Sequence, residues 1–289
     1  MQDFILILLF GVSAAWLAER FGQPTAVAQV LVGLIIGPTL LGWTEPGEEL
    51  QLLGQLGVLL LLGMAGMQLG LGQLAREGWT GFRVALLGVI FCLAGGYAFA
   101  LWWGSPLEEA VYIGATLTAT SIGISVQVLH QLRLIDHRVG RIVIAAAVID
   151  DVIALYLLAI AHGVLSEELA PVRLAGSIVM AAVILALIFV TCRWLAQRSD
   201  ARLFSFQYPV SLLAVVLTIV AFGWLTETMG YSLVVGGFFA GLGLGDGLEK
   251  AHRNRLVKQM DVLVLLLVPF FFVIVGSRAE WGALTDRGM

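Results

Sequence analysis

Long apolar runs separated by short polar connections recur along almost the whole chain of 289 residues. A helix needs about 20 apolar residues to cross roughly 30 Å of hydrocarbon, and the runs are close to that length. The pattern therefore predicts ten membrane-spanning helices. The predicted spans are Phe4–Ala18, Thr25–Gly42, Leu50–Leu71, Val84–Gly104, Ala110–Leu129, Ile142–His162, Leu174–Leu195, Tyr208–Leu225, Tyr231–Leu244 and Met260–Gly276.

The composition supports a lipid environment for the whole chain. Hydrophobic residues make up 60% of the sequence, charged residues only 12%, and the mean hydropathy is +0.96. A water-soluble domain could not cover so much apolar surface. We expect an all-α polytopic membrane protein in which residues 1–289 form a single transmembrane domain. Cys92 and Cys192 fall inside apolar spans and are expected to be packing residues.

The basic residues are distributed unevenly over the connections between the predicted spans. Odd-numbered connections and the span ends beside them carry 13 of the 16 Lys and Arg residues, and such a bias marks the cytoplasmic side. We expect odd-numbered loops in the cytoplasm and both ends of this chain outside, in a bacterial inner membrane. The 13 residues are Arg20, Arg76, Arg83, Arg133, Arg138, Arg141, Arg193, Arg198, Arg202, Lys250, Arg253, Arg255 and Lys258.

Two adjacent acids, Asp150 and Asp151, lie in the middle of the sixth predicted span, in the run AAAVIDDVIALYLLAIA. One charge at the centre of a spanning helix costs roughly 3 kcal/mol on insertion scales. Neighbouring helical residues point about 100° apart, so the two carboxyl groups cannot face one point equally, although they would titrate as a coupled pair. The cost favours a functional site, with an acid pair that only anchors helix–helix hydrogen bonds as the alternative.

The fifth predicted span crowds small hydroxyl residues and a glycine into its centre, in ATLTATSIGIS (Ala115–Ser125). Such a segment favours a break in the helix that exposes carbonyl and hydroxyl oxygens to a cation, while close helix packing is the alternative. Carboxylate, hydroxyl and carbonyl oxygens suit a hard monovalent cation. An apolar surround also lets a carboxyl group hold a proton, so one group can exchange the two ions.

Six segments, taken in order, resemble the monovalent cation:proton antiporter 2 family of sodium/proton and potassium/proton exchangers. They are QPTAVAQVLVGLIIGPTLLG, LGVLLLLGMAGMQLGL, ATLTATSIGISVQVL, AAVIDDVIALYLLA, GYSLVVGGFFAGL and VPFFFVIVGS. The resemblance implies that Asp151 exchanges the cation for a proton, with Asp150 as its partner, and that Thr118, Thr120 and Ser121 lie where the unwound fifth helix crosses.

The resemblance also implies an architecture. It is an inverted-repeat fold, with residues 25–163 as the first repeat and residues 230–277 as the start of an incomplete second one, in a homodimer. The substrates implied are protons and Na⁺, K⁺ or Li⁺, with no enzymatic activity, no cofactor and no nucleic-acid partner. The family usually has thirteen helices, so we expect a sequence truncated at its C-terminus.

Two other functions fit parts of the sequence. A non-transporting sensor or regulatory remnant would keep the antiporter scaffold without exchange. The segment GLGLGDG contains the GxGD pattern of intramembrane aspartyl proteases, with Gly243, Gly245 and Asp246. Asp246, however, falls at the basic end of its span and is expected to be a helix-end residue. Of the other polar residues, Gln29 and Gln127 are predicted to bridge neighbouring helices.

Overall fold

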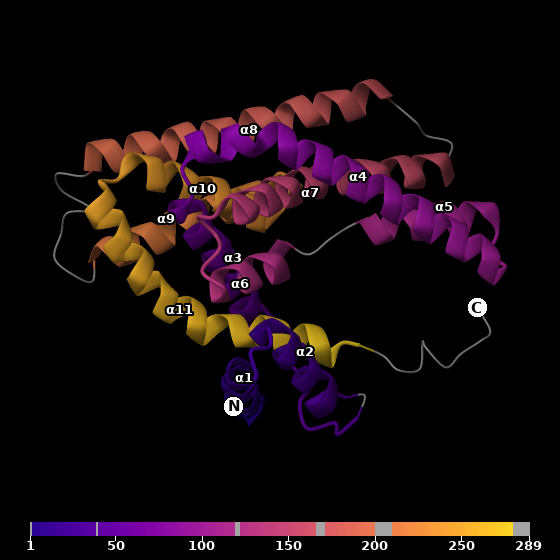
Figure 1. Cartoon of the computed structure of the whole chain (residues 1–289), viewed down its shortest axis with the longest axis horizontal. Coiled ribbons are helices and arrows are strands. Elements are labelled where there is room, and N and C mark those ends of the chain that lie inside the picture. The colour runs from indigo at the N-terminus through magenta and orange to yellow at the C-terminus, as the bar shows by residue number, and fades with distance from the viewer. Residues whose placement is uncertain (1, 39, 119–121, 166–170, 200–209, 280–289) are drawn as a thin grey trace.

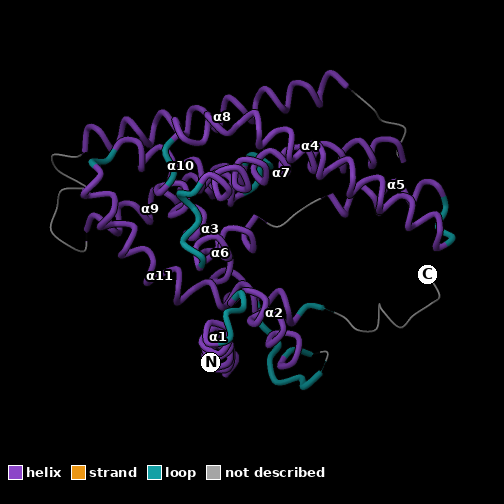
Figure 2. The backbone as a smooth tube through the Cα atoms, in the orientation of Figure 1, coloured by secondary structure: helices purple, strands orange, loops and turns teal. Residues whose placement is uncertain are grey.

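The computed structural model describes residues 2–38, 40–118, 122–165, 171–199 and 210–279, and the regular secondary structure of these residues is entirely helical, with short loops between the helices (Figure 2). Within these residues the chain forms eleven helices (Figure 1). They are α1 (Gln2–Arg20), α2 (Thr25–Ile36), α3 (Glu48–Gln68), α4 (Leu71–Trp103), α5 (Leu107–Thr118), α6 (Ile122–Gln131), α7 (Arg138–Leu165), α8 (Pro171–Ser199), α9 (Val210–Thr228), α10 (Leu233–Gly247) and α11 (Lys250–Ser277).

The ten predicted spans account for these helices, because α5 and α6 are the two parts of the predicted fifth span. The all-α prediction is confirmed. Six helical stretches of the described residues are long and apolar enough to cross a membrane, and one of them runs from α5 through α6. The helices α2 and α10 are apolar but shorter.

Helix α3 is the centre of the larger group of helices. Its stretch Val58–Met67 is buried, and the helix packs against α10 and α11 along its length. The close approach depends on glycine: a Cβ atom added at Gly241 of α10 would collide with the Gly63 carbonyl of α3, and one at Gly57 would collide with Leu267 of α11. Helices α1, α2 and α9 complete this group through α11, α10 and one another.

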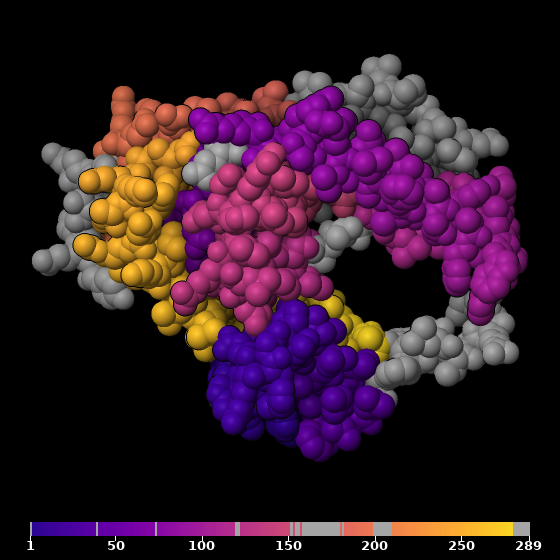
Figure 3. All heavy atoms as spheres, in the orientation of Figure 1, coloured from indigo at the N-terminus to yellow at the C-terminus, as the bar shows by residue number. Residues whose placement is uncertain are grey.

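A second group consists of α4, α5 and α7, which pack against each other. Helix α6 lies between the groups, because it contacts α7 on one side and α2 and α3 on the other. Figure 3 shows the pink segment that contains α6 exposed on one face, between indigo α1 and α2 and gold α11. The two parts of the fifth span therefore belong to different packing environments.

Three predicted boundaries were wrong, and one of them is the start of α11 at Lys250 rather than Met260. Helix α2 ends at Ile36 rather than Gly42, since Pro38 has no N–H and disfavours helical backbone at Gly37. Helix α4 begins at Leu71 rather than Val84, and its extra turns are amphipathic rather than wholly apolar. Prediction from apolar length alone cannot detect such an extension.

Helix α4 also indicates where the bilayer lies. Trp79 near one end is 67% exposed, and Trp102 and Trp103 at the other end are 77% and 59% exposed. Tryptophan prefers the interfaces of a membrane, and Trp79 and Trp103 are ~36 Å apart along the helix axis. That separation matches the hydrocarbon core plus part of the headgroup layers.

Candidate functional site

The acid pair lies near the middle of α7. Asp150 is ~18 Å along the helix from its first residue, Arg138, and its side chain is 8% exposed. The backbone of Asp151 is helical, while its side chain lies outside the described part of the structure. A carboxyl group at this depth is removed from water by the surrounding helices, which is the setting predicted for an ion site.

The helix break predicted in the fifth span falls on residues 119–121, which lie outside the described residues, so the break stays a prediction. Helix α5 ends at Thr118 and α6 begins at Ile122, so the described backbone is helical up to one side of residues 119–121 and again from the other. Both α5 and α6 contact α7, the helix of the acid pair. Thr120 and Ser121, predicted to belong to the site, lie outside the described residues.

Thr118 is the hydroxyl residue of the predicted site that the structure describes. Its side chain is 1% exposed, and its Oγ1 donates a hydrogen bond to the Ala115 carbonyl over 2.7 Å. A hydroxyl that donates to a carbonyl keeps lone pairs on its oxygen. Thr118 is therefore a buried hydroxyl group at the last described residue of α5.

Glutamine side chains fasten α6 to the start of α2. Gln127 Nε2 donates to Thr25 Oγ1 over 3.3 Å, and the Thr25 N–H donates to Gln131 Oε1 over 2.9 Å. Gln131 Nε2 also donates to the Gln23 carbonyl over 3.0 Å, so it takes the place of a local N-cap for α2. The bridging predicted for Gln127 is confirmed. Gln29 likewise donates to the Gly11 carbonyl of α1, over 3.4 Å.

An ion-pair cluster holds the first turn of α7, and the sequence did not suggest it. Glu77 of α4 is 9% exposed, and its Oε1 lies 3.3 Å from Arg138 Nε and 4.0 Å from Arg141 Nη2. A signal was present: Glu77 is four residues before buried Gly81, which is four before buried Ala85. That spacing places Glu77 on the buried stripe of α4, which faces α7.

A histidine at the end of α6 contacts α11. His130 Nε2 lies 3.3 Å from Asp261 Oδ1, with His130 25% and Asp261 53% exposed. This contact joins α6 to α11, the helix that packs along α3. It is a polar link between the two groups of helices near their basic end.

Asp246, the acid of the GxGD pattern, has a structural partner. Its Oδ1 accepts a hydrogen bond from the Leu71 backbone N–H over 3.2 Å. Leu71 is the first residue of α4, and its N-cap, Gly70, offers no side-chain oxygen. Asp246 therefore caps α4 from a distant part of the chain, which agrees with a helix-end role and not with a protease dyad.

Comparisons with known proteins agree with this geometry. The family model described as sodium/hydrogen exchanger, transmembrane, matches residues 5–286. The Na⁺/H⁺-K⁺ antiporter GerN of Bacillus cereus is 33% identical over 285 residues, covering 98% of this chain and 72% of the relative. An Na⁺/H⁺ antiporter of Enterococcus hirae is 28% identical over 285 residues, covering 98% and 74%.

A solved structure has a similar fold. The sodium proton antiporter MjNhaP1 from Methanocaldococcus jannaschii matches with a TM-score of 0.66, covering 98% of this chain and 71% of that one. The sequences are 20% identical, so this likeness concerns the fold.

Proposed function

Because this chain belongs to the sodium/hydrogen exchanger family, we propose that it exchanges a monovalent cation for protons across a bacterial inner membrane. The observation that carries the proposal is the doubled acid in the middle of α7, with Asp150 buried, on a helix that contacts both α5 and α6. Keeping such acids at membrane depth is costly, and ion exchange gives them a use.

The proposed exchange needs one site and no covalent step. Asp151 binds the cation as a carboxylate, Asp150 supports it, and oxygens of Thr118, Thr120 and Ser121 complete the coordination. When the cation leaves, the same carboxyl group takes up a proton. Since the site holds either the cation or the proton, moving the two ions in opposite directions couples their gradients.

Access to the site from both sides requires a movement of helices. We propose that the group of α4, α5 and α7 moves against the group around α3, with α6 at the boundary. The division of helix contacts into these two groups supports the idea. Helix α8 follows α7 in the chain but packs on α10 of the larger group, so it links the two groups. The repeats at 25–163 and 230–277, and a homodimer, belong to the same proposal.

Proteoliposomes test the function directly. The purified chain would be reconstituted with a pH-sensitive dye inside, and Na⁺, Li⁺ or K⁺ added outside. We expect a cation-driven change of internal pH that is lost in Asp151→Asn and strongly reduced in Asp150→Asn. Asp246→Asn is the matched control, because it removes one carboxylate away from the site and keeps an oxygen for the Leu71 N–H.

The outcome separates the candidate functions. A pH change that survives Asp151→Asn would overturn the proposed site. A flat trace from a correctly folded wild-type chain would overturn exchange by this chain and favour the sensor or regulatory remnant. The cation that gives the largest response identifies the preferred substrate.

A further inference from the structure

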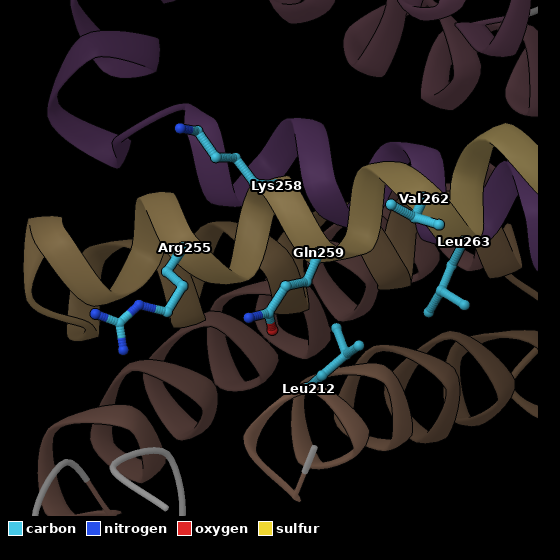
Figure 4. A pocket seen from close by; sticks show the side chains of 6 residues that line it. All are labelled: Leu212, Arg255, Lys258, Gln259, Val262 and Leu263. Carbon is cyan, nitrogen blue, oxygen red and sulfur yellow. The ribbon is translucent and has the colours of Figure 1, made fainter. Parts of the chain in front are cut away.

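A groove between α9 and α11 lies at the basic end of the larger helix group. It has a volume of about 400 Å³, within the range of small-molecule sites. The residues that line it are Leu212 of α9 and Arg255, Lys258, Gln259, Val262 and Leu263 of α11. In Figure 4, Gln259 extends from α11 toward Leu212, Arg255 leaves α11 on the same side but nearer its start, and Lys258 leaves α11 on the opposite side.

The two cations of this groove belong to the basic residues that have no partner among the described residues. Arg138 and Arg141 contact Glu77, Arg253 donates to the Gly245 carbonyl, and the guanidinium groups of Arg20, Arg83 and Arg198 lie over tryptophan rings. Arg255 and Lys258 make no hydrogen bond or ion pair with a described residue, and the nearby carboxylate of Asp261 contacts His130. No described carboxylate therefore neutralises either cation of the groove.

The groove contains an unused acceptor beside these cations. Gln259 Oε1 is buried and has no hydrogen-bond partner among the described residues. A buried acceptor left without a donor costs free energy, so a bound ligand that offers a hydroxyl or N–H would be favoured here. An inorganic anion alone would satisfy the cations without supplying that donor.

Farther along α11 from its basic start, apolar side chains are exposed. Val262 is 67% exposed and Leu265 71% exposed, and on α9 Leu213 is 57% and Leu217 58% exposed. Arg255 and Val262 are ~10 Å apart along the helix, about the distance from a lipid phosphate to the first part of its acyl chain. Along α11 the order is thus positive charge, then a polar acceptor, then exposed apolar side chains.

We propose that this groove binds an anionic phospholipid with a hydroxyl-bearing headgroup, of the phosphatidylglycerol type. The guanidinium of Arg255 contacts the phosphate, Lys258 adds positive charge at the mouth, and Gln259 Oε1 accepts a headgroup hydroxyl. One acyl chain lies along Val262 and Leu265. The bound lipid joins α9 to α11 at a place where these helices otherwise contact each other little.

The test measures binding and does not require transport. The detergent-purified chain would be titrated with phosphatidylglycerol or phosphatidylcholine while its thermal unfolding is followed. We expect phosphatidylglycerol to raise the midpoint temperature and phosphatidylcholine to leave it unchanged, since only a ligand of the folded state stabilises it. In Arg255→Ala/Lys258→Ala the apparent dissociation constant should rise about ten-fold or more.

Matched variants make the result specific. Arg76→Ala/Lys250→Ala removes the same charge from the basic ends of α4 and α11 without touching the groove and should keep wild-type binding. Gln259→Leu should abolish the preference for phosphatidylglycerol over phosphatidic acid, which lacks a headgroup hydroxyl.

Two results would overturn the proposal. One is equal loss of binding in both double variants, which would mean that only overall charge matters. The other is full stabilisation by inorganic phosphate alone, which would identify a soluble-anion site. Unfolding midpoints in phosphatidylcholine establish that each variant is folded before the comparison is made.

Discussion

The side chain of Asp246 shows that an acid near the end of a span can have a structural role instead of a catalytic or ion-binding one. It caps α4 by accepting from the Leu71 N–H, so Asp246→Ala should destabilise the protein by about 1 kcal/mol, the usual value of an N-cap. Asp246→Asn keeps the acceptor oxygen and should be nearly neutral. Thermal unfolding in detergent measures both variants. Equal destabilisation by Ala and Asn would mean that the charge, rather than the hydrogen bond, is what matters.

Glu77 is the second acid whose value depends on its partners. Removing it in Glu77→Ala leaves Arg138 and Arg141 without their carboxylate, and we expect a loss of about 1–2 kcal/mol in stability. The ion pair between Glu77 and Arg138 contributes little of this loss in stability, because the Arg138 side chain is 69% exposed. Chemical denaturation compares Glu77→Ala with Glu49→Ala, which removes an exposed acid from the first turn of α3. An equal effect of the two would contradict a specific role for Glu77.

Residue by residue, the sequence was most informative where a side chain contradicted its surroundings. Asp150 and Asp151 were identified because an acid in an apolar run is costly whatever it touches. The partners of Glu77, His130 and Asp246 were not predicted, since a polar residue near a span end looks the same in the sequence whether it is solvated or paired. Their roles depend on partners far along the chain, and only the folded arrangement reveals those.

At the scale of helices, close packing through glycine makes a sharp prediction. A Cβ at Gly241 would collide with the backbone of α3 at Gly63, so Gly241→Ala must push α10 from α3 and should cost about 1–3 kcal/mol. Gly88 of α4 has open space where its Cβ would lie, so Gly88→Ala should be neutral or gain up to ~1 kcal/mol from better helix propensity. Unfolding curves in detergent compare the stability of the two variants. Equal effects of Gly241→Ala and Gly88→Ala would show that α10 and α3 are not tightly packed at Gly241.

The helices themselves were predicted from length and composition, and the failures have physical causes. The spans were found because crossing hydrocarbon requires a long apolar run. The early end of α2 follows from Pro38, a local signal that outweighs apolar character. The long start of α4 follows from the Asp246 cap and the Glu77 contacts, which are tertiary.

For the whole molecule, the arrangement places polar links at helix ends and leaves the middle of α7 for the acids. The links Glu77 to Arg138, Gln127 to Thr25 and His130 to Asp261 each join helices that flank the proposed site. Polar contacts near the helix ends can hold these helices in place while the middle of α7 carries the two acids. A transporter needs such an arrangement, because its ion site must keep its shape when it faces either side of the membrane.

The orientation of the whole chain follows from the distribution of basic residues and can be measured with single cysteines. Cys92 and Cys192 would first be replaced by alanine, so that each variant carries a single cysteine. Glu45 lies in an even-numbered connection, whereas His137 and Asn254 lie in or beside odd-numbered connections. All three positions are exposed. A membrane-impermeant thiol reagent on intact cells should label Glu45→Cys alone, and the other two only after permeabilisation. The reverse pattern would place 13 basic residues outside, against the bias that charge imposes on membrane insertion.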